Sequence, residues 1–227
     1  MQLQLLRDGL DQFADSLNQG YDTGLAALYE SIQPWQQVWP PATPSDLAKT
    51  LEDALHNTRS RSYWQGHAYQ PKEVLVTLAR ANPEGVNLAF GRLFNRSLSL
   101  GERYSGFVYY LDEMLREWQR DQGPQAAQIH HHDDYRAPSL YCALRFPEED
   151  AYFESEVYAA ALRKLRAPNV SPAPDPDRFE KTVRVIGNFM DKHKSLQAAH
   201  ARRLTNADYS KTCRLLVSEF LRYLAQQ

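Results

Sequence analysis

The sequence lacks most features that mark a membrane, secreted or nucleotide-hydrolysing protein. Only two of its 227 residues are cysteines, Cys142 and Cys213, which excludes a disulfide framework and a four-cysteine metal site. The longest apolar runs are too short to span a bilayer. Residues 1–19 contain charged side chains among their leucines, so they do not form the apolar region of a signal peptide. We therefore expect a cytoplasmic protein without membrane contact.

Motifs of the commonest enzyme classes are also absent. There is no Gly-x4-Gly-Lys-Ser/Thr phosphate loop, no Gly-x-Gly-x-x-Gly fingerprint, no Gly-x-Ser-x-Gly elbow and no His-Glu-x-x-His zinc motif. A complete ATPase of the P-loop class is excluded. For this chain we expect no catalytic activity of its own, no cofactor and no metal site.

Charge is nearly balanced over the whole chain but unevenly placed along it. Lys and Arg number 26 against 28 Asp and Glu, a net charge of −2, which argues against a surface that is basic throughout and coats nucleic acid. Residues 178–227 hold ten Lys and Arg against four Asp and Glu, so they carry +6 and residues 1–177 carry −8. This basic end, with the adjacent Arg202 and Arg203, is a candidate partner-binding surface. Simple segregation of charge on helix surfaces is the alternative.

Hydrophobic residues recur with the period of an α-helix along nearly the whole chain. Leu3, Leu6, Leu10 and Phe13, for example, step by three and four residues and form one apolar stripe. Similar stretches predict an all-α fold, an irregular multi-helix bundle of about eight to ten helices. Besides the helices, the sequence also allows one short β-hairpin near residues 151–158.

Local signals predict several helix boundaries. Ser99 and Glu102 form a capping box before a long periodic stretch, and Asn82 followed by a proline is a typical helix start. Pro34 is expected to end the second helix. The last helix is expected to carry the apolar residues between 209 and 224.

Changes in composition divide the chain into four segments. Residues 1–70 are expected to hold N-terminal helices and an aromatic loop, and residues 71–166 a central helical domain. Four prolines force residues 167–177 into an extended linker. Residues 178–227 then form a C-terminal helical pair, expected to pack on the same core.

The densest polar cluster runs from His130 to Arg136. On a helix His130 and Asp134 would share one face, and imidazole with carboxylate is a suitable ligand set for the divalent metal of a nuclease or hydrolase. His132 and Asp133 complete this cluster of candidate site residues. The alternative is structural: one of the aspartates caps the following helix, and Arg136 pairs with a carboxylate.

A second candidate site is the aromatic loop, which we define as residues 59–69. Its candidate residues are Arg59, Arg61, Tyr63, Trp64, His67 and Tyr69. Aromatic rings beside arginines can stack on nucleic-acid bases; filling a gap between helices is the alternative. Arg61 and His67 also match the Arg-x4–6-His spacing of HEPN-type helical ribonucleases, in which the His acts as general base and the Arg stabilises the phosphorane.

From residue 75 onward the order of motifs resembles a known family. The motifs are Asn82-Pro83, Phe90-Gly91-Arg92-Leu93-Phe94, Leu100-Gly101-Glu102-Arg103, Asp134-Tyr135-Arg136-Ala137-Pro138-Ser139 and Phe146-Pro147. The helical region that precedes the AAA+ motor in McrB-like restriction proteins similarly reads Asn-Pro, Phe-x-x-Leu-Phe, Leu-x-x-Arg, Asp-Glu-Arg-x-x-Ser and an aromatic-Pro end. This chain departs from the pattern after Pro147, where acidic residues replace a stretch often rich in Lys and Tyr.

The resemblance implies a role in anti-phage defence. McrB-like proteins sense foreign DNA with their N-terminal part, hydrolyse GTP or ATP in the motor and recruit a nuclease subunit. By this analogy the chain is a non-catalytic specificity or interaction module of a restriction-modification system. Its implied partners are DNA, an AAA+ motor in cis or in trans, and a nuclease subunit. A small helical nuclease and a protein-docking helical bundle are the alternative functions.

Overall fold

The part of the chain that the structure describes folds into helices without any strand. This computed structural model describes residues 1–66, 68–123, 129–206 and 208–227, and within these ranges the predicted all-α class is confirmed. The α-helices there are α1 (Leu3–Asn18), α2 (Tyr29–Val38), α3 (Leu47–Ala54), α4 (Pro71–Ala81), α5 (Pro83–Leu93), α6 (Leu100–Gln122), α7 (Arg136–Arg145), α8 (Ser155–Lys164), α9 (Pro176–Met190), α10 (Lys194–Arg203) and α11 (Leu215–Gln226). Three short 3-10 helices are η1 (Leu25–Leu28), η2 (Pro44–Asp46) and η3 (Arg61–Tyr63). None of these helices has both the length and the apolarity to cross a lipid bilayer.

Side chains next to the helix starts explain where several helices begin. Before α6, the backbone N–H of Glu102 donates to Ser99 Oγ at 3.3 Å, and the Ser99 N–H donates to the Glu102 carboxylate at 2.9 Å, so the predicted capping box is present. Before α5, Asn82 Oδ1 accepts a hydrogen bond from the Gly85 N–H at 2.8 Å, as predicted. These side chains satisfy backbone donors that no helical carbonyl can reach.

Two local expectations from the sequence are wrong. Pro34 does not end the second helix, because α2 continues to Val38 with the proline inside it. Full burial of Trp35, the next residue, offsets the hydrogen bond that proline removes. The hairpin considered near residues 151–158 is not formed, because the chain there is a single extended segment that leads into α8 at Ser155.

One helix was not expected from the sequence at all. The segment Lys194–Arg203 forms α10, in which only Leu196, Ala199 and His200 are buried. So few buried residues make too weak an apolar stripe for the periodicity to show. The final helix is also shorter than expected, since α11 begins only at Leu215.

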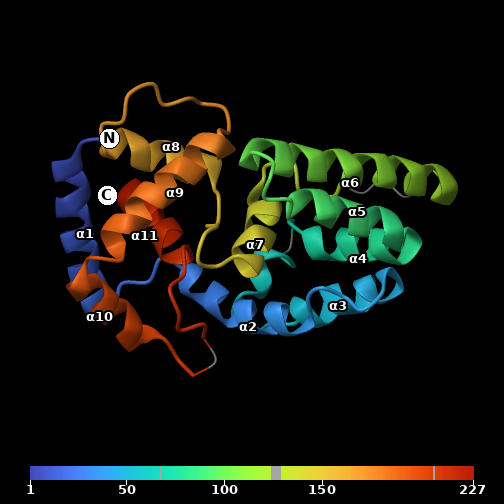
Figure 1. The fold of residues 1–227 in the computed structure, drawn as a ribbon, viewed down its shortest axis with the longest axis horizontal. Helices are drawn as coiled ribbons and strands as arrows, with labels where there is room; N and C mark the ends of the chain where they lie inside the picture. Colours follow the sequence, from blue (N-terminus) through green and yellow to red (C-terminus); the bar gives the residue numbers. More distant parts are fainter. Residues whose placement is uncertain (67, 124–128, 207) are drawn as a thin grey trace.

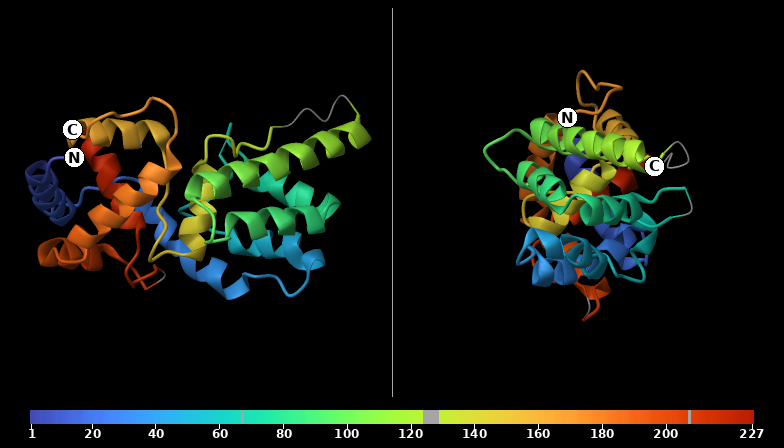
Figure 2. Two further views of the ribbon diagram at one scale, coloured as in Figure 1. Left: turned by 45° about the horizontal axis from the view of Figure 1, so that its top comes forward. Right: turned by 90° about the vertical axis from the view of Figure 1, so that its right-hand side faces the viewer.

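The helices form two groups that lie side by side along the long axis of the molecule (Figure 1). One group contains α1, α8, α9, α10 and α11; the other contains α3, α4, α5 and α6, with α2 and α7 between them. Figure 2 shows the same division from two further directions. Residues 1–70 contribute helices to both groups, and α10 and α11 pack against α1, so both ends of the chain share one helix group.

A cluster of aromatic rings joins the two groups at α2 and α7. Trp35 lies between Trp39 and Tyr141, with nearly parallel rings and centroid distances of 5.1 and 5.7 Å. Phe90 of α5 packs against the same rings, 4.6 Å from the Trp39 centroid. Large buried rings contribute much of the packing free energy of a core. This cluster therefore holds the group of α3, α4, α5 and α6 against α2 and α7.

Candidate functional site

The aromatic side chains of the aromatic loop pack against the protein. Trp64 is only 1% exposed, so its ring is not available for stacking on a base in this conformation. Tyr63 donates a hydrogen bond from its hydroxyl to the Gly24 carbonyl at 2.7 Å. The guanidinium of Arg136 lies over the Tyr69 ring, 4.1 Å from its centroid. These contacts hold the loop against its neighbours, which is the packing alternative considered for it.

The two arginines of the aromatic loop differ in their surroundings. Arg59 forms an ion pair with Glu30 at 3.1 Å and another with Asp208, so it ties the loop to α2 and to the segment before α11. Arg61, by contrast, is exposed and lines a groove. His67 lies outside the described residues, so the Arg61–His67 pair stays a prediction.

The adjacent arginines of the basic C-terminal segment also separate. Arg203 Nη1 donates to a Glu219 carboxylate oxygen at 2.7 Å, and this fully buried carboxylate also accepts from the Tyr29 hydroxyl at 2.9 Å. Arg203 is therefore a neutralised charge between α10 and α11. Arg202 stays on the surface and donates to Asn18 Oδ1 at 3.0 Å.

Both histidines singled out in the polar cluster have partners inside the protein. His130 Nε2 lies 2.9 Å from an Asp112 carboxylate oxygen. His132 is fully buried, with Nε2 3.2 Å from the Tyr141 hydroxyl oxygen. Burial lowers the pKa of His132 well below its ordinary value, and the neighbouring His130 lowers it further. The His132 ring is therefore neutral and structural at ordinary pH.

The two acidic residues of the polar cluster differ in their contacts. Asp134 accepts a hydrogen bond from the Arg136 backbone N–H at 2.9 Å and pairs with its guanidinium at 2.6 Å, which is the carboxylate partner that the structural alternative expected for Arg136. The N-cap residue of α7 is Tyr135, which makes no side-chain cap, so neither aspartate is the N-cap. The Asp133 side chain is 81% exposed. Among the residues that the structure describes, no three or more His, Cys, Asp or Glu side chains are placed to hold a metal ion.

The two cysteines are not placed to act as nucleophiles. Burial raises the pKa of Cys213 to about 12 and also raises that of Cys142. Both thiols therefore stay protonated, and a protonated buried thiol is unreactive.

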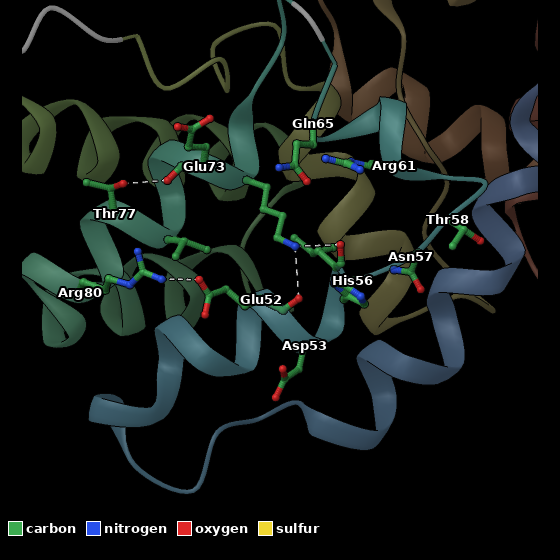
Figure 3. A pocket seen from close by; sticks show the side chains of 13 residues that line it. Glu52, Asp53, His56, Asn57, Thr58, Arg61, Gln65, Glu73, Thr77 and Arg80 are labelled. Atoms are coloured by element: carbon green, nitrogen blue, oxygen red, sulfur yellow. Dashed lines mark hydrogen bonds and ion pairs between the residues drawn. The ribbon is translucent and has the colours of Figure 1, made fainter.

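A large groove opens between α3 and α4, with a volume of about 850 Å³ (Figure 3). We call it the α3–α4 groove. Its size lies within the range of small-molecule sites. It is lined by Glu52, Asp53, Leu55, His56, Asn57, Thr58, Arg61, Gln65, Lys72, Glu73, Val76, Thr77 and Arg80.

Lys72 ties the two helices of the groove together. Its ammonium donates to the Leu55 carbonyl at 3.0 Å and to the Glu52 carbonyl at 3.2 Å, at the end of α3 where carbonyls lack helical partners. Burial lowers the pKa of Lys72; the Glu52 charge opposes this effect and the positive charge of Arg61 adds to it. The ammonium of Lys72 is thus a partly desolvated charge within the electrostatic reach of Arg61.

Two carboxylates of the groove already have cationic partners. Glu52 pairs with Arg80, a contact that Figure 3 shows joining the two helices, and Asp53 pairs with Lys49 at 2.6 Å. Arg61, however, has neither an ion pair nor a side-chain hydrogen bond in the part of the chain that the structure describes. The groove therefore contains a cation that the described protein leaves uncompensated.

Sequence reasoning named Arg61 but missed the groove. In the sequence, most of the other groove residues look like ordinary solvent-exposed positions of amphipathic helices. One local signal was present: Lys72 follows Pro71 in the first turn of α4, where the helix dipole disfavours a cation. A lysine at that place indicates an acceptor elsewhere in the fold, which the end of α3 provides.

Comparisons of the chain with protein family models, with curated proteins and with solved structures find no match. A functional proposal therefore rests on the geometry of the groove and on the motif series between residues 82 and 147.

Proposed function

We propose that this chain is a non-catalytic helical module that binds an anionic group of its ligand in the α3–α4 groove. One observation carries the proposal. Within the described residues, Arg61 and Lys72 line the same hollow without an ion-pair partner, whereas Glu52 and Asp53 are paired. Glu73, which is exposed, is the lining carboxylate without an ion pair in those residues. Positive charge in a concave, partly desolvated surface raises the local concentration of anions.

The non-catalytic part of the proposal is supported by what the reactive groups do. His132 is buried beside Tyr141, His130 is paired with Asp112, and both thiols are buried with raised pKa values. An active site needs a nucleophile or base that is held open toward a substrate. These groups are instead engaged in the interior.

The motif series supplies the biological setting. We propose that the module serves a McrB-like restriction system as its specificity or interaction module, beside an AAA+ motor and a nuclease subunit. The gene context tests this setting: we expect a reading frame that continues into a Gly-x4-Gly-Lys-Ser/Thr segment, or neighbouring motor and nuclease genes. A frame that ends with neither alongside overturns the setting but leaves the binding proposal standing.

The binding proposal is tested by following backbone amide resonances of the full chain during titration with anions. The probes are inorganic phosphate, a short single-stranded DNA and a short duplex. We expect at least one probe to shift the amides of residues 52–80, and Arg61→Gln to remove that shift. If no probe perturbs these amides, the groove is not an anion site.

An incubation with single-stranded RNA and DNA, with Mg²⁺ or Mn²⁺ present, tests the alternative of a small nuclease. We expect no cleavage. Cleavage that disappears in the His67→Ala or Arg61→Gln variant would show that the Arg-x4–6-His spacing is catalytic and would overturn the non-catalytic assignment.

A further inference from the structure

We infer that the ligand group bound in the α3–α4 groove is a phosphate monoester, held by Arg61 and Lys72. This inference rests on the proposed function and narrows it to one ligand chemistry.

Two cations without an ion pair favour a dianion. Arg61 and Lys72 each carry one positive charge without an ion-pair partner in the described ranges of the chain, and the Arg61 charge acts on Lys72. Glu73, which lines the same groove, likewise has no ion pair in those ranges. A phosphate monoester carries about −1.5 to −2 at neutral pH and matches both cations. A carboxylate or a phosphodiester carries one negative charge, so it leaves one of the cations uncompensated.

The donors of Arg61, Lys72 and Gln65 also suit three phosphate oxygens. The Arg61 guanidinium has five N–H donors in a fork that fits phosphate, and it has no other acceptor in the described structure. Lys72 uses its ammonium for two carbonyls, which leaves one of three protons free. Gln65, exposed on the same loop as Arg61, adds an amide donor, and Figure 3 shows both side chains on the loop side of the groove.

The remaining walls of the groove favour a compact ligand over a polyanion. Glu73 is exposed and lines the same groove, so a chain of phosphates that ran along it would meet a carboxylate. The volume of about 850 Å³ leaves room beyond the phosphate for a small organic group. Leu55, Val76 and Thr77 would face that group, and hydroxyls or an amine on it would suit Glu73.

The lowered pKa of Lys72 agrees with this assignment. Burial is the largest cause, the negative charges of Glu52 and Asp53 act in the opposite direction, and the nearby positive charge of Arg61 lowers the pKa further. A bound dianion would compensate both ammonium and guanidinium and favour the charged form of the lysine again.

The inference is tested by isothermal titration of the full chain with matched small probes. Glycerol 3-phosphate is the monoester, dimethyl phosphate the monoanionic diester, and glycerate the carboxylate analogue. We expect measurable binding of glycerol 3-phosphate, at least about tenfold weaker binding of the other two, and about a tenfold or greater loss in Arg61→Gln, since hydrogen bonds to charged groups contribute this much. Arg61 is the decisive position, because Lys72→Met also breaks the tie between α3 and α4.

A matched control and a second source of the same chemistry sharpen the result. Arg116→Gln removes an exposed arginine of α6 that, among the residues that the structure describes, pairs with Glu113 three positions before it, and it should bind like the wild type. An equal loss in both variants indicates diffuse electrostatic attraction and overturns the inference. A 5′-phosphorylated tetranucleotide that binds more tightly than glycerol 3-phosphate supports monoester recognition at a nucleic-acid end.

The outcomes separate this inference from the proposed function. Equal or tighter binding of glycerate or dimethyl phosphate in the groove overturns the monoester inference and leaves an anion-binding module. The absence of amide shifts at residues 52–80 with every probe overturns both.

Discussion

Acid should destabilise this protein through His200, which α10 places in a buried ionic network. His200 is 7% exposed, and its Nδ1 accepts a hydrogen bond from Arg203 Nη2 at 2.9 Å. Arg203 in turn pairs with the fully buried Glu219. Burial and then the Arg203 charge lower the pKa of His200 from its ordinary 6.5 to about 4, although Glu219 and Asp208 act in the opposite direction.

The sign and size of the effect follow from these two pKa values. Between pH 4 and 6.5 the unfolded chain binds the His200 proton and the folded protein does not, so the free energy of unfolding falls as the pH falls through this window. The two pKa values differ by about 2.5, and each pKa unit corresponds to about 1.4 kcal/mol, so the whole effect amounts to about 3.5 kcal/mol, of which about 3 falls between pH 6.5 and 4. Above pH 6.5 the His200 contribution is constant.

The measurement is urea unfolding at a series of pH values for the wild type and for His200→Gln. Other groups, such as His132 with its lowered pKa, also favour unfolding in acid, but they are present in both proteins. We expect the wild type to lose about 3 kcal/mol more than the variant between pH 6.5 and 4. Equal acid losses in wild type and His200→Gln would refute the reasoning.

Two substitutions and one labelling experiment test other buried groups. Trp64→Ala should lower the free energy of unfolding by about 3–5 kcal/mol, because it empties a site that is 1% exposed; a loss below about 1 kcal/mol in urea unfolding would contradict the packing described for the aromatic loop. Asp150→Ala should cost about 3–5 kcal/mol in the same assay, since it leaves the buried Arg103 guanidinium, 3.1 Å from the lost carboxylate, without its carboxylate partner and also removes the ion pair with Arg96; a neutral effect would count against these pairs. Cys142 and Cys213 should react with a thiol reagent only after denaturation, and rapid reaction of the native protein would contradict their burial and raised pKa values.

Helix positions were predictable wherever a local pattern fixes them. The Ser99–Glu102 capping box and the Asn82 cap are interactions between residues three apart, so the sequence contains both partners. The helix end predicted at Pro34 was wrong because the interactions that continue α2 are not local. Its local effect ends helices, but the buried Trp35 beside it depends on partners in α5 and α7 that local sequence does not reveal.

The roles of the candidate site residues were likewise predictable only where the partner is close in the sequence. The pairing of Asp134 with Arg136 spans two residues and was anticipated as a structural alternative. The roles of Arg59 and Arg203 were not, because their carboxylate partners lie at Glu30, Asp208 and Glu219, in other elements. From the sequence alone, such an arginine looks like an exposed surface charge, because the carboxylate that neutralises it comes close only in the packed structure.

The all-α fold and the starts of the capped helices could be predicted from the sequence alone, because apolar periodicity and side-chain caps act within a few residues. Which charges have an ion-pair partner depends on how the helices pack. The α3–α4 groove exists because α3 and α4 pack together, which places Lys72 on the end of α3, pairs Arg80 with Glu52 and leaves Arg61 without a partner in the described chain. Ion pairing depends on distance in space, and residues from 52 to 80 come within that distance only when the helices are packed.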